Sequence, residues 1–280
     1  MKRSRLVLLS LVALALPAGA QEWRTLDVSR QLRDSASHRV RVEYGAGTFE
    51  LKASADPVLY SMQLRYDEQK GGNPLHKYDG DAHDVTLGIS SQTFHVSRHM
   101  DLSKEGEMRL ALGRGVPMDL ELNLGAAQAR ADLGGISLRS LRLETGASDT
   151  RLEFSAMNAV AMTELDANAG AAALELVDIA NANTGRVRVR GGVGGLTLGF
   201  GGAWTRDMDL DVSVALGKVT VKVPSDVGVR IELSRMLATF DHEGLEKRSD
   251  AWYSTNWDRA KYHLRIKGET TIGAFALERL

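Results

Sequence analysis

Five glycines recur at nearly regular intervals through the middle of the chain, and they constrain its fold more than any other feature. They stand 21, 24, 24 and 23 residues apart, at Gly125, Gly146, Gly170, Gly194 and Gly217. An aliphatic residue precedes each glycine by five positions, and mostly apolar residues follow it by four and six. Such alternation has the period of a β-strand, and a repeat of about 20–50 residues is typical of stacked repeats. Each glycine supplies the backbone freedom for a corner between two short strands.

Charged residues between the glycines support the same interpretation. Four residues before the first four glycines stand Glu121, Arg142, Asp166 and Arg190. If each repeat is one turn of a coil, equivalent residues lie about 4.8 Å apart, so this column alternates in sign and its neighbours attract. The sequence therefore predicts an all-β fold: a β-solenoid of about 21–24 residues per turn, with an aliphatic interior and a ladder of charges outside.

Residues 1–20 have the pattern of a secretory signal peptide. Basic residues at positions 2, 3 and 5 precede an apolar run over 6–16, and small residues at 18–20 form a cleavage site. The run is shorter than the roughly 18 residues of a membrane span. We expect an exported protein, periplasmic or on the cell surface. The alternative is that the segment is kept as an anchor.

Charge and cysteine content exclude several classes of function. Removing the three basic residues of the signal takes the net charge from −1 to −4. This balance argues against nucleic acid as a partner and gives the chain as a whole no attraction to anionic membranes. The chain has no cysteine, which excludes disulfides, thiol catalysis and cysteine metal sites. Export without disulfides fits a bacterial periplasm or surface.

The remaining chain divides into three parts. Residues 21–39 form a polar lead-in that we expect to be partly helical. Residues 40–115, with turn signals and short alternating runs, form a small antiparallel β module that caps the first turn of the solenoid. Residues 116–280 hold the solenoid repeats and a C-terminal cap, and strands within 264–277 are expected to close that end. Caps are needed because the last turn of a solenoid is an open sheet edge.

Four stretches together resemble a known family. They read GVPMDLELNLGA at 115–126, LRLETGA at 141–147, GGVGGLTLGFGGAW at 191–204 and LGKVTVKVPSDVGV at 216–229. As a set they resemble the bacterial toast-rack family of exported proteins. The repeat domain of that family is similar to the C-terminal domain of the Lia-type, cell-wall-active-antibiotic-response proteins. The resemblance covers roughly residues 40–280.

The resemblance implies a right-handed β-helix in an adhesin-like protein of the cell envelope. The Lia-type relatives modulate an envelope-stress kinase through a domain tethered to transmembrane helices. This sequence departs from them because it carries a cleavable signal in place of those helices. The family offers no catalytic residues to carry over.

Acidic and basic residues on the repeats suggest ligand sites, but pairing with each other is the favoured explanation. The aspartates at 207, 209 and 211 share one face of a strand, as calcium-binding carboxylates do. The glycine spacing places Asp209 beside Arg186 and Asp211 beside Arg188. The same pairing accounts for the arginine stripe over 186–190, whose alternative role is to bind an acidic glycan.

Glu144, Asp149 and Glu153 are the nearest approach to the paired carboxylates of a polysaccharide-cleaving enzyme. Such an enzyme also needs a cleft with aromatic platforms, and Phe154 and Phe200 occupy positions that face the core. We therefore predict no catalytic residue. We also predict no metal site and no cofactor.

One aromatic group stands out near the C-terminus. Trp252, Tyr253, Trp257 and Tyr262 form either a cap over the last turn or a patch that binds a partner. The partner would be an envelope protein or glycan, or another copy of the chain.

Three functions follow from these expectations. The first is a non-enzymatic, adhesin-like or scaffold role at the cell envelope. The alternatives are an accessory sensor of envelope stress similar to the Lia-type proteins, and a polysaccharide-active β-helix enzyme. Outward charges that are paired along the wall favour the first function, whereas a cleft with unpaired carboxylates and aromatics favours the enzyme.

Overall fold

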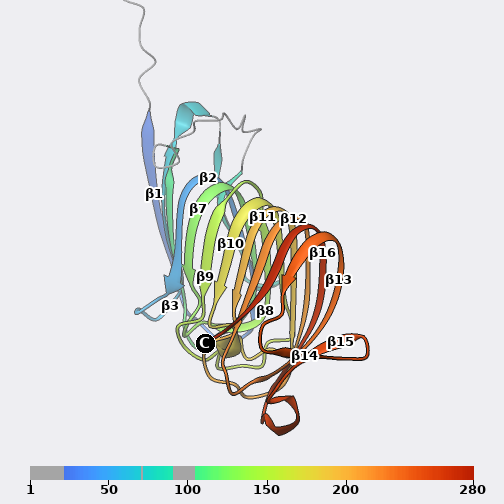
Figure 1. Cartoon of the computed structure of the whole chain (residues 1–280). Coiled ribbons are helices and arrows are strands. Elements are labelled where there is room, and N and C mark those ends of the chain that lie inside the picture. Colours follow the sequence, from blue (N-terminus) through green and yellow to red (C-terminus); the bar gives the residue numbers. More distant parts are fainter. Residues whose placement is uncertain (1–21, 71, 91–104) are drawn as a thin grey trace, which may run out of the picture.

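The computed structural model describes residues 22–70, 72–90 and 105–280, and in this part of the chain the fold is all-β. The expected signal peptide lies outside the described residues. All sixteen strands belong to one mixed sheet (Figure 1). Their bounds are β1 Trp23–Gln31, β2 His38–Ala53, β3 Val58–Asp67, β4 Asn73–Asp79, β5 Asp84–Ser90, β6 Glu107–Leu112, β7 Pro117–Asp132, β8 Ser137–Thr145, β9 Asp149–Glu153, β10 Leu165–Val177, β11 Arg186–Gly199, β12 Met208–Val223, β13 Gly228–Asp241, β14 Leu245–Arg248, β15 Ala251–Ser254 and β16 His263–Arg279. Single 3₁₀ turns lie at Glu68–Lys70, Ile179–Ala182 and Trp257–Arg259.

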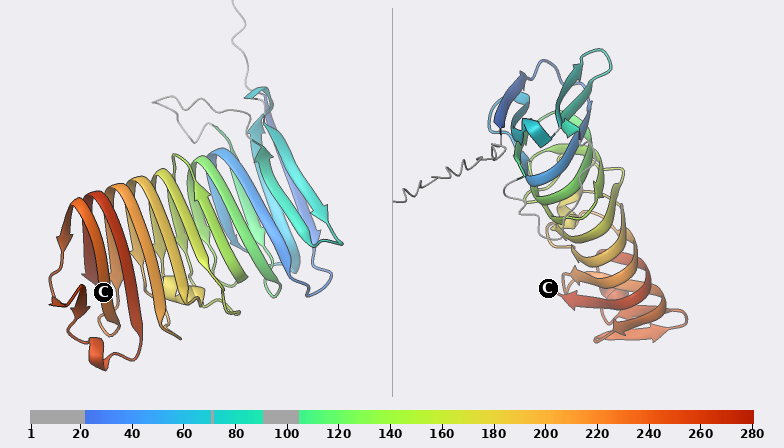
Figure 2. Two further views of the ribbon diagram at one scale, coloured as in Figure 1. Left: turned by 90° about the vertical axis from the view of Figure 1, so that its right-hand side faces the viewer. Right: turned by 90° about the horizontal axis from the view of Figure 1, so that it is seen from above.

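Most of the sheet is a stack of arched strands that pair in parallel with their neighbours (Figure 2). The order is β2, β7, β8 with β9, β10, β11, β12, β16 and β13. Each long strand bends near its middle, which divides it into a first leg and a second leg. We call this set of strands the parallel stack.

One column of aliphatic side chains shows why the first legs hold together. The eight side chains of this column, which lie opposite one another on successive strands, are at most 2% exposed. Burial of such side chains is the main source of stability in a fold of this kind. The column is Val40, Leu120, Leu141, Leu165, Val187, Leu210, Ile266 and Ile231.

The repeating glycines fall into two columns, not one. In the first, Gly125, Gly146, Gly170 and Gly192 each stand against the backbone of the glycine before them, starting from Gly45. In the second, Gly194, Gly217 and Gly273 lie opposite one another with positive φ. The strand β11 contributes to both columns, so Gly170 is in register with Gly192 and the alignment of Gly170 with Gly194 was wrong by two residues.

The N-terminal end of the stack is covered by antiparallel strands. β3 pairs with both β1 and β6, while β4 and β5 form a hairpin against β2. β2 itself pairs in parallel with β7 along most of its length. The lead-in was expected to be partly helical, and this was wrong: residues 23–31 form β1, whose alternating exposed and half-buried residues fit an edge strand.

The C-terminal end has a strand order that differs from the chain order. β16 is inserted between β12 and β13, so the outermost strand of the stack is β13 and the expectation that residues 264–277 close this end was wrong. The hairpin of β14 and β15 pairs with β13 only at Arg230 and Ile231. From Leu233 to Asp241, β13 pairs with β16 on one side, and no other described strand pairs with its outer side, so this outer edge is open.

Candidate binding surfaces

The outer face of the first legs carries a continuous ladder of alternating charge. Eight residues that lie opposite one another on successive strands change sign at every step. Arg41 pairs with Glu121 at 3.2 Å and Arg188 with Asp166 at 3.3 Å. The ladder is Arg41, Glu121, Arg142, Asp166, Arg188, Asp211, Lys267 and Glu232.

The predicted alternation is confirmed, and its fourth member needs correction. Arg188 lies opposite Asp166, where the glycine spacing had placed Arg190. A shift of two residues keeps every side chain on its own face of the strand, so the sign pattern survives. Arg190 nevertheless reaches the same carboxylate, with its Nη1 3.3 Å from Asp166 Oδ1.

Two of the three aspartates of β12 and the loop before it, Asp207 and Asp209, are held by arginine. Asp209 lies opposite Arg186 and Asp211 opposite Arg188, as predicted. The ion pairs of Asp207 and Asp209 are formed with the strand on the other side of β12. Arg265 of β16 binds Asp207 at 2.9 Å and Asp209 at 3.4 Å. The interpretation of these carboxylates as surface charges that lie beside basic residues therefore fits the structure.

The three carboxylates considered for catalysis each face a different arginine. Glu144 binds Arg142 at 2.9 Å, on the first leg. Asp149 lies 3.5 Å from Arg130 and Glu153 lies 3.3 Å from Arg151, both on second legs. Phe154 and Phe200 are fully buried, as predicted. No pair of these acids is brought together around a common point.

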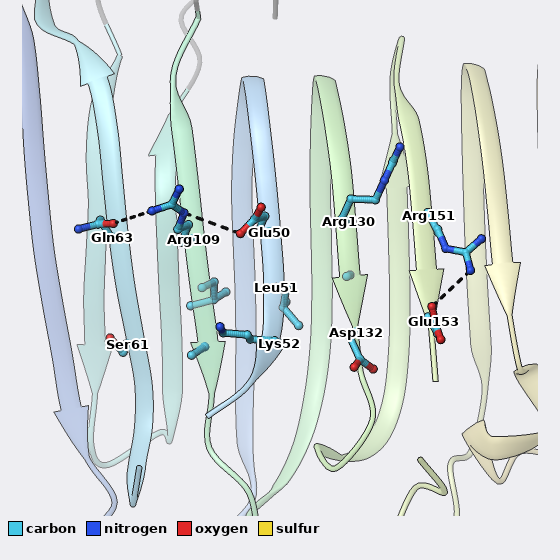
Figure 3. Close-up of a pocket in the computed structure, with 13 residues that line it drawn as sticks. Glu50, Leu51, Lys52, Ser61, Gln63, Arg109, Arg130, Asp132, Arg151 and Glu153 are labelled. Atoms are coloured by element: carbon cyan, nitrogen blue, oxygen red, sulfur yellow. Dashed lines mark hydrogen bonds and ion pairs between the residues drawn. The ribbon is translucent and has the colours of Figure 1, made fainter. Parts of the chain in front are cut away.

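We call the strands β1 and β3–β6 at the N-terminal end the antiparallel cover. A groove of about 360 Å³ lies where the antiparallel cover meets the parallel stack (Figure 3). It crosses the second legs of β2, β7 and β9 and the neighbouring strands β6 and β3. Short side chains at Ser61 and Ala111 lie between longer ones, which leaves the hollow. Its lining is Glu50, Leu51, Lys52, Ser61, Gln63, Arg109, Leu110, Ala111, Arg130, Ala131, Asp132, Arg151 and Glu153.

The carboxylates of the groove all have partners. Glu50 lies 3.7 Å from Arg109, and Glu153 pairs with Arg151. Asp132 accepts hydrogen bonds from the hydroxyl of Ser155 and from a backbone N–H. No aromatic side chain lines the groove. The arrangement lacks the free acid pair and the platform that cleavage of a polysaccharide needs.

Two cationic features distinguish the groove from the charge ladder. Arg130 lies directly opposite Arg151, a like-charge pair that disfavours the sheet. Arg151 turns away toward Glu175 of β10, whose hydrogen bond raises the pKa of the guanidinium. Lys52 extends from β2 toward β6 across the floor (Figure 3), and none of the described residues forms an ion pair with its amine. An unpaired amine in a hollow is suited to an anionic group of a ligand.

Sequence reasoning missed this groove because its residues come from five separate strands. One signal was present: the column through the second legs breaks the alternation of sign at Arg130 and Arg151. A break in a local rule is a reason to look for function. This break in the alternation of sign depends on the register of β7 with β9, which the sequence does not reveal.

The C-terminal aromatic residues predicted as a partner-binding patch are half-buried and do not form one cluster. Trp252 stacks on His242 with ring centroids 4.3 Å apart and meets the edge of Phe240 at 5.6 Å. Phe240 in turn contacts the buried Phe275. Trp252 therefore covers the second leg of the outermost strand, as a cap would.

The other three aromatic residues lie on the first-leg side. Trp257 meets Tyr253 at 5.3 Å and His263 at 4.5 Å. Tyr262 stacks on Trp204 at 6.4 Å. Each retains exposed surface beside these contacts, so a binding role for the four residues stays a prediction.

Comparison with solved structures finds matches of low sequence identity that extend over most of this chain. One, from Clostridium sporogenes ATCC 15579, is provisionally described as a cell adhesion protein; it is 14% identical with a TM-score of 0.45, covering 93% of this chain and all of its own. Another, from Bacteroides fragilis NCTC 9343, is provisionally described as an adhesin; it is 12% identical with a TM-score of 0.39, covering 93% and 98%. No curated protein matches the chain.

Helices long and apolar enough to cross a bilayer are absent from the described residues. The family model of the N-terminal domain of toast_rack, DUF2154, matches residues 19–176. The match spans more than half of the 280 residues, and it includes the first repeats of the parallel stack as well as its antiparallel cover. The predicted family is thereby confirmed, and the chain belongs to the toast-rack family.

Proposed function

We propose that this chain is an exported, non-enzymatic binding protein of the bacterial cell envelope, adhesin-like in role. It would act as a rigid right-handed β-solenoid that presents binding surfaces at fixed spacing. The observation that carries the proposal is the difference in charge pairing between the ladder on the first legs and the groove on the second legs. Every step of the ladder on the first legs joins residues of opposite charge, whereas no described residue forms an ion pair with the amine of Lys52 in the groove.

The groove suits an extended polar ligand with an anionic group. It crosses five neighbouring strands, and strands lie about 4.8 Å apart, so a chain lying across them would span about 20 Å. Gln63 and Ser61 offer hydrogen bonds at one end, and Lys52 offers a charge near the middle. An acidic glycan or an acidic peptide of an envelope protein meets these requirements.

The paired carboxylates and the lack of aromatic lining favour binding over cleavage in this groove. The sensor role of the Lia-type relatives is not favoured by any particular feature of the described residues. We therefore retain the binding role as the conclusion.

Binding of the chain from residue 21 onward to separated envelope glycans and envelope proteins tests the proposal. Lys52→Glu should weaken saturable binding by about 1.5 kcal/mol, roughly tenfold, because a charged hydrogen bond is lost and repulsion is added. Lys77→Glu, an exposed lysine on β4 outside the groove, is the matched control. Equal binding by Lys52→Glu and the parent would remove the groove from the account.

A second variant separates the groove from the aromatic residues. Trp252→Ala combined with Trp257→Ala should abolish binding if the partner docks at the C-terminal end, and should leave it intact if the groove is the site. The melting temperature of each variant must be measured as well, since Trp252 also covers Phe240.

A further inference from the structure

An exposed apolar ridge runs along the bend of the last four strands of the parallel stack. Val193, Leu216, Ile272 and Leu237 lie opposite one another on β11, β12, β16 and β13. They are 51%, 44%, 43% and 69% exposed, and the adjacent Met236 is 73% exposed. Contiguous exposed apolar residues of this kind mark an interaction surface. We call these five residues the apolar ridge.

The ridge is convex. Its members stand on the outside of the bend, one residue before the positive-φ glycines of β11, β12 and β16. The bends of these strands lie side by side along one edge of the stack (Figure 2). Three steps between strands give the ridge a length of about 14 Å. The equivalent position on β10 is Ala171, a small side chain. The ridge therefore begins at β11, the strand that carries glycines of both columns.

Basic side chains flank the ridge on both sides of the bend. Lys218 lies two residues after Leu216, and Arg235 lies two residues before Leu237. Both are exposed, and neither forms an ion pair with a described residue. Arg190 lies three residues before Val193 and is engaged with Asp166. The single acid at a comparable distance is Glu269, so the surroundings of the ridge are cationic although the whole chain carries a net charge of −1.

A convex row of aliphatic tips flanked by cations fits a phospholipid surface better than it fits a folded partner. A second copy meeting ridge to ridge would make a narrow contact, well below the roughly 1,000 Å² of a specific interface. A bilayer requires no complementary groove. Its head-group phosphates would lie at the level of Lys218 and Arg235, whose alkyl chains can follow the apolar tips inward.

We propose that the apolar ridge docks on the surface of a phospholipid bilayer. Only the side chains enter the acyl region. The open edge of β13 stays among the head groups, because its unpaired N–H and C=O groups are costly to place in hydrocarbon. The lipid contact is independent of the groove and places the C-terminal end of the stack against a membrane.

Flotation with vesicles of phosphatidylcholine and phosphatidylglycerol tests the proposal. The chain from residue 21 onward is used, because an apolar leader would itself bind vesicles and the described fold begins at residue 22. The parent should float with the vesicles. Met236→Ser combined with Leu237→Ser should lower the partition coefficient about tenfold or more, since most of the inserted apolar area is removed. Lys218→Glu with Arg235→Glu should lower it severalfold, more at low salt than at high salt.

Matched controls keep the result interpretable. Leu280→Ser removes another exposed leucine (59%, against 69% for Leu237) away from the ridge and should float like the parent, as should Lys77→Glu and the groove variant Lys52→Glu. Absence of flotation by the parent overturns the proposal. So does equal flotation of the ridge variants, or a concentration-dependent doubling of mass that the ridge variants abolish, which would assign the ridge to a second copy.

Discussion

Gly217 on β12 lies directly opposite Gly194 on β11, and the carbonyl oxygen of Gly194 occupies the space that a Cβ at position 217 would need. Gly217 also has a φ of 149°, which side chains other than glycine rarely adopt. Close approach of backbones and an unusual φ thus coincide at one corner of the stack. The same relationship is repeated between Gly273 and Gly217.

Gly217→Ala should therefore destabilise the fold by at least about 2 kcal/mol, lowering the melting temperature by several degrees. The control is Gly195→Ala, on the neighbouring strand, where a Cβ meets nothing and φ is not in the left-handed region. That variant should change stability by less than about 0.5 kcal/mol. Equal melting temperatures for the two variants would contradict the column of close-packed corners.

Arg142→Glu should place three acids in succession along the ladder, because Arg142 lies between Glu121 and Asp166. We expect the melting temperature to fall by a few degrees at low salt and by less at high salt, since exposed charges are screened. Arg142→Gln removes the charge without reversing it and should have a smaller effect. An unchanged melting temperature for Arg142→Glu at low salt would show that the ladder has no energetic role.

Glu121 links the ladder to pH. Its partial burial acts to raise its pKa, but hydrogen bonds from Asn123 and Arg41 outweigh this and hold the pKa below the ordinary value near 4.5. A depressed pKa in the folded state stabilises the protein above the ordinary value, and that stabilisation is lost as the pH falls through the folded-state pKa.

Glu121→Gln should consequently lower stability by up to about 1 kcal/mol at pH 7 and have no effect at pH 2. Denaturant unfolding across this pH range measures the difference. Glu243→Gln, at an exposed turn, is the control and should show no pH-dependent difference. A Glu121→Gln penalty that persists undiminished at pH 2 would rule out the ion pair as its cause.

Two buried tyrosines should respond oppositely to removal of the hydroxyl. The Tyr44 hydroxyl is buried without a hydrogen-bond partner among the described residues, and burial raises its pKa. The Tyr60 hydroxyl lies 2.8 Å from His76 Nε2. Tyr44→Phe should be neutral or stabilising by up to about 1 kcal/mol, and Tyr60→Phe should be destabilising by about 1 kcal/mol. Thermal unfolding of the two variants checks the order, which a reversal would disprove.

Local periodicity was enough to predict much of the fold. The aliphatic positions of the repeats, including Leu120, Leu141 and Leu165, are buried as expected. A period of two along each strand fixes which side chains face inward, whatever the exact register. The register itself failed between Gly170 and Gly194, because β11 carries glycines of both columns and the spacing alone could not tell which one continued the first.

Relationships between distant segments could not be predicted in the same way. Nothing in the residues of β16 shows that it pairs between β12 and β13. The groove likewise depends on how the antiparallel cover meets β2, β7 and β9. The apolar ridge was hidden because residues such as Val193 and Leu216 look like core residues until the bend of the strand is known.

Binding and turnover measured in one experiment test the central claim most directly. The chain from residue 21 onward is incubated with purified envelope glycan and protein fractions, and bound chain and released fragments are followed over hours. We predict saturable binding that Lys52→Glu weakens about tenfold, with both fractions left intact. Release of new glycan or peptide ends by the parent chain, in proportion to its concentration, would contradict a non-enzymatic binding role.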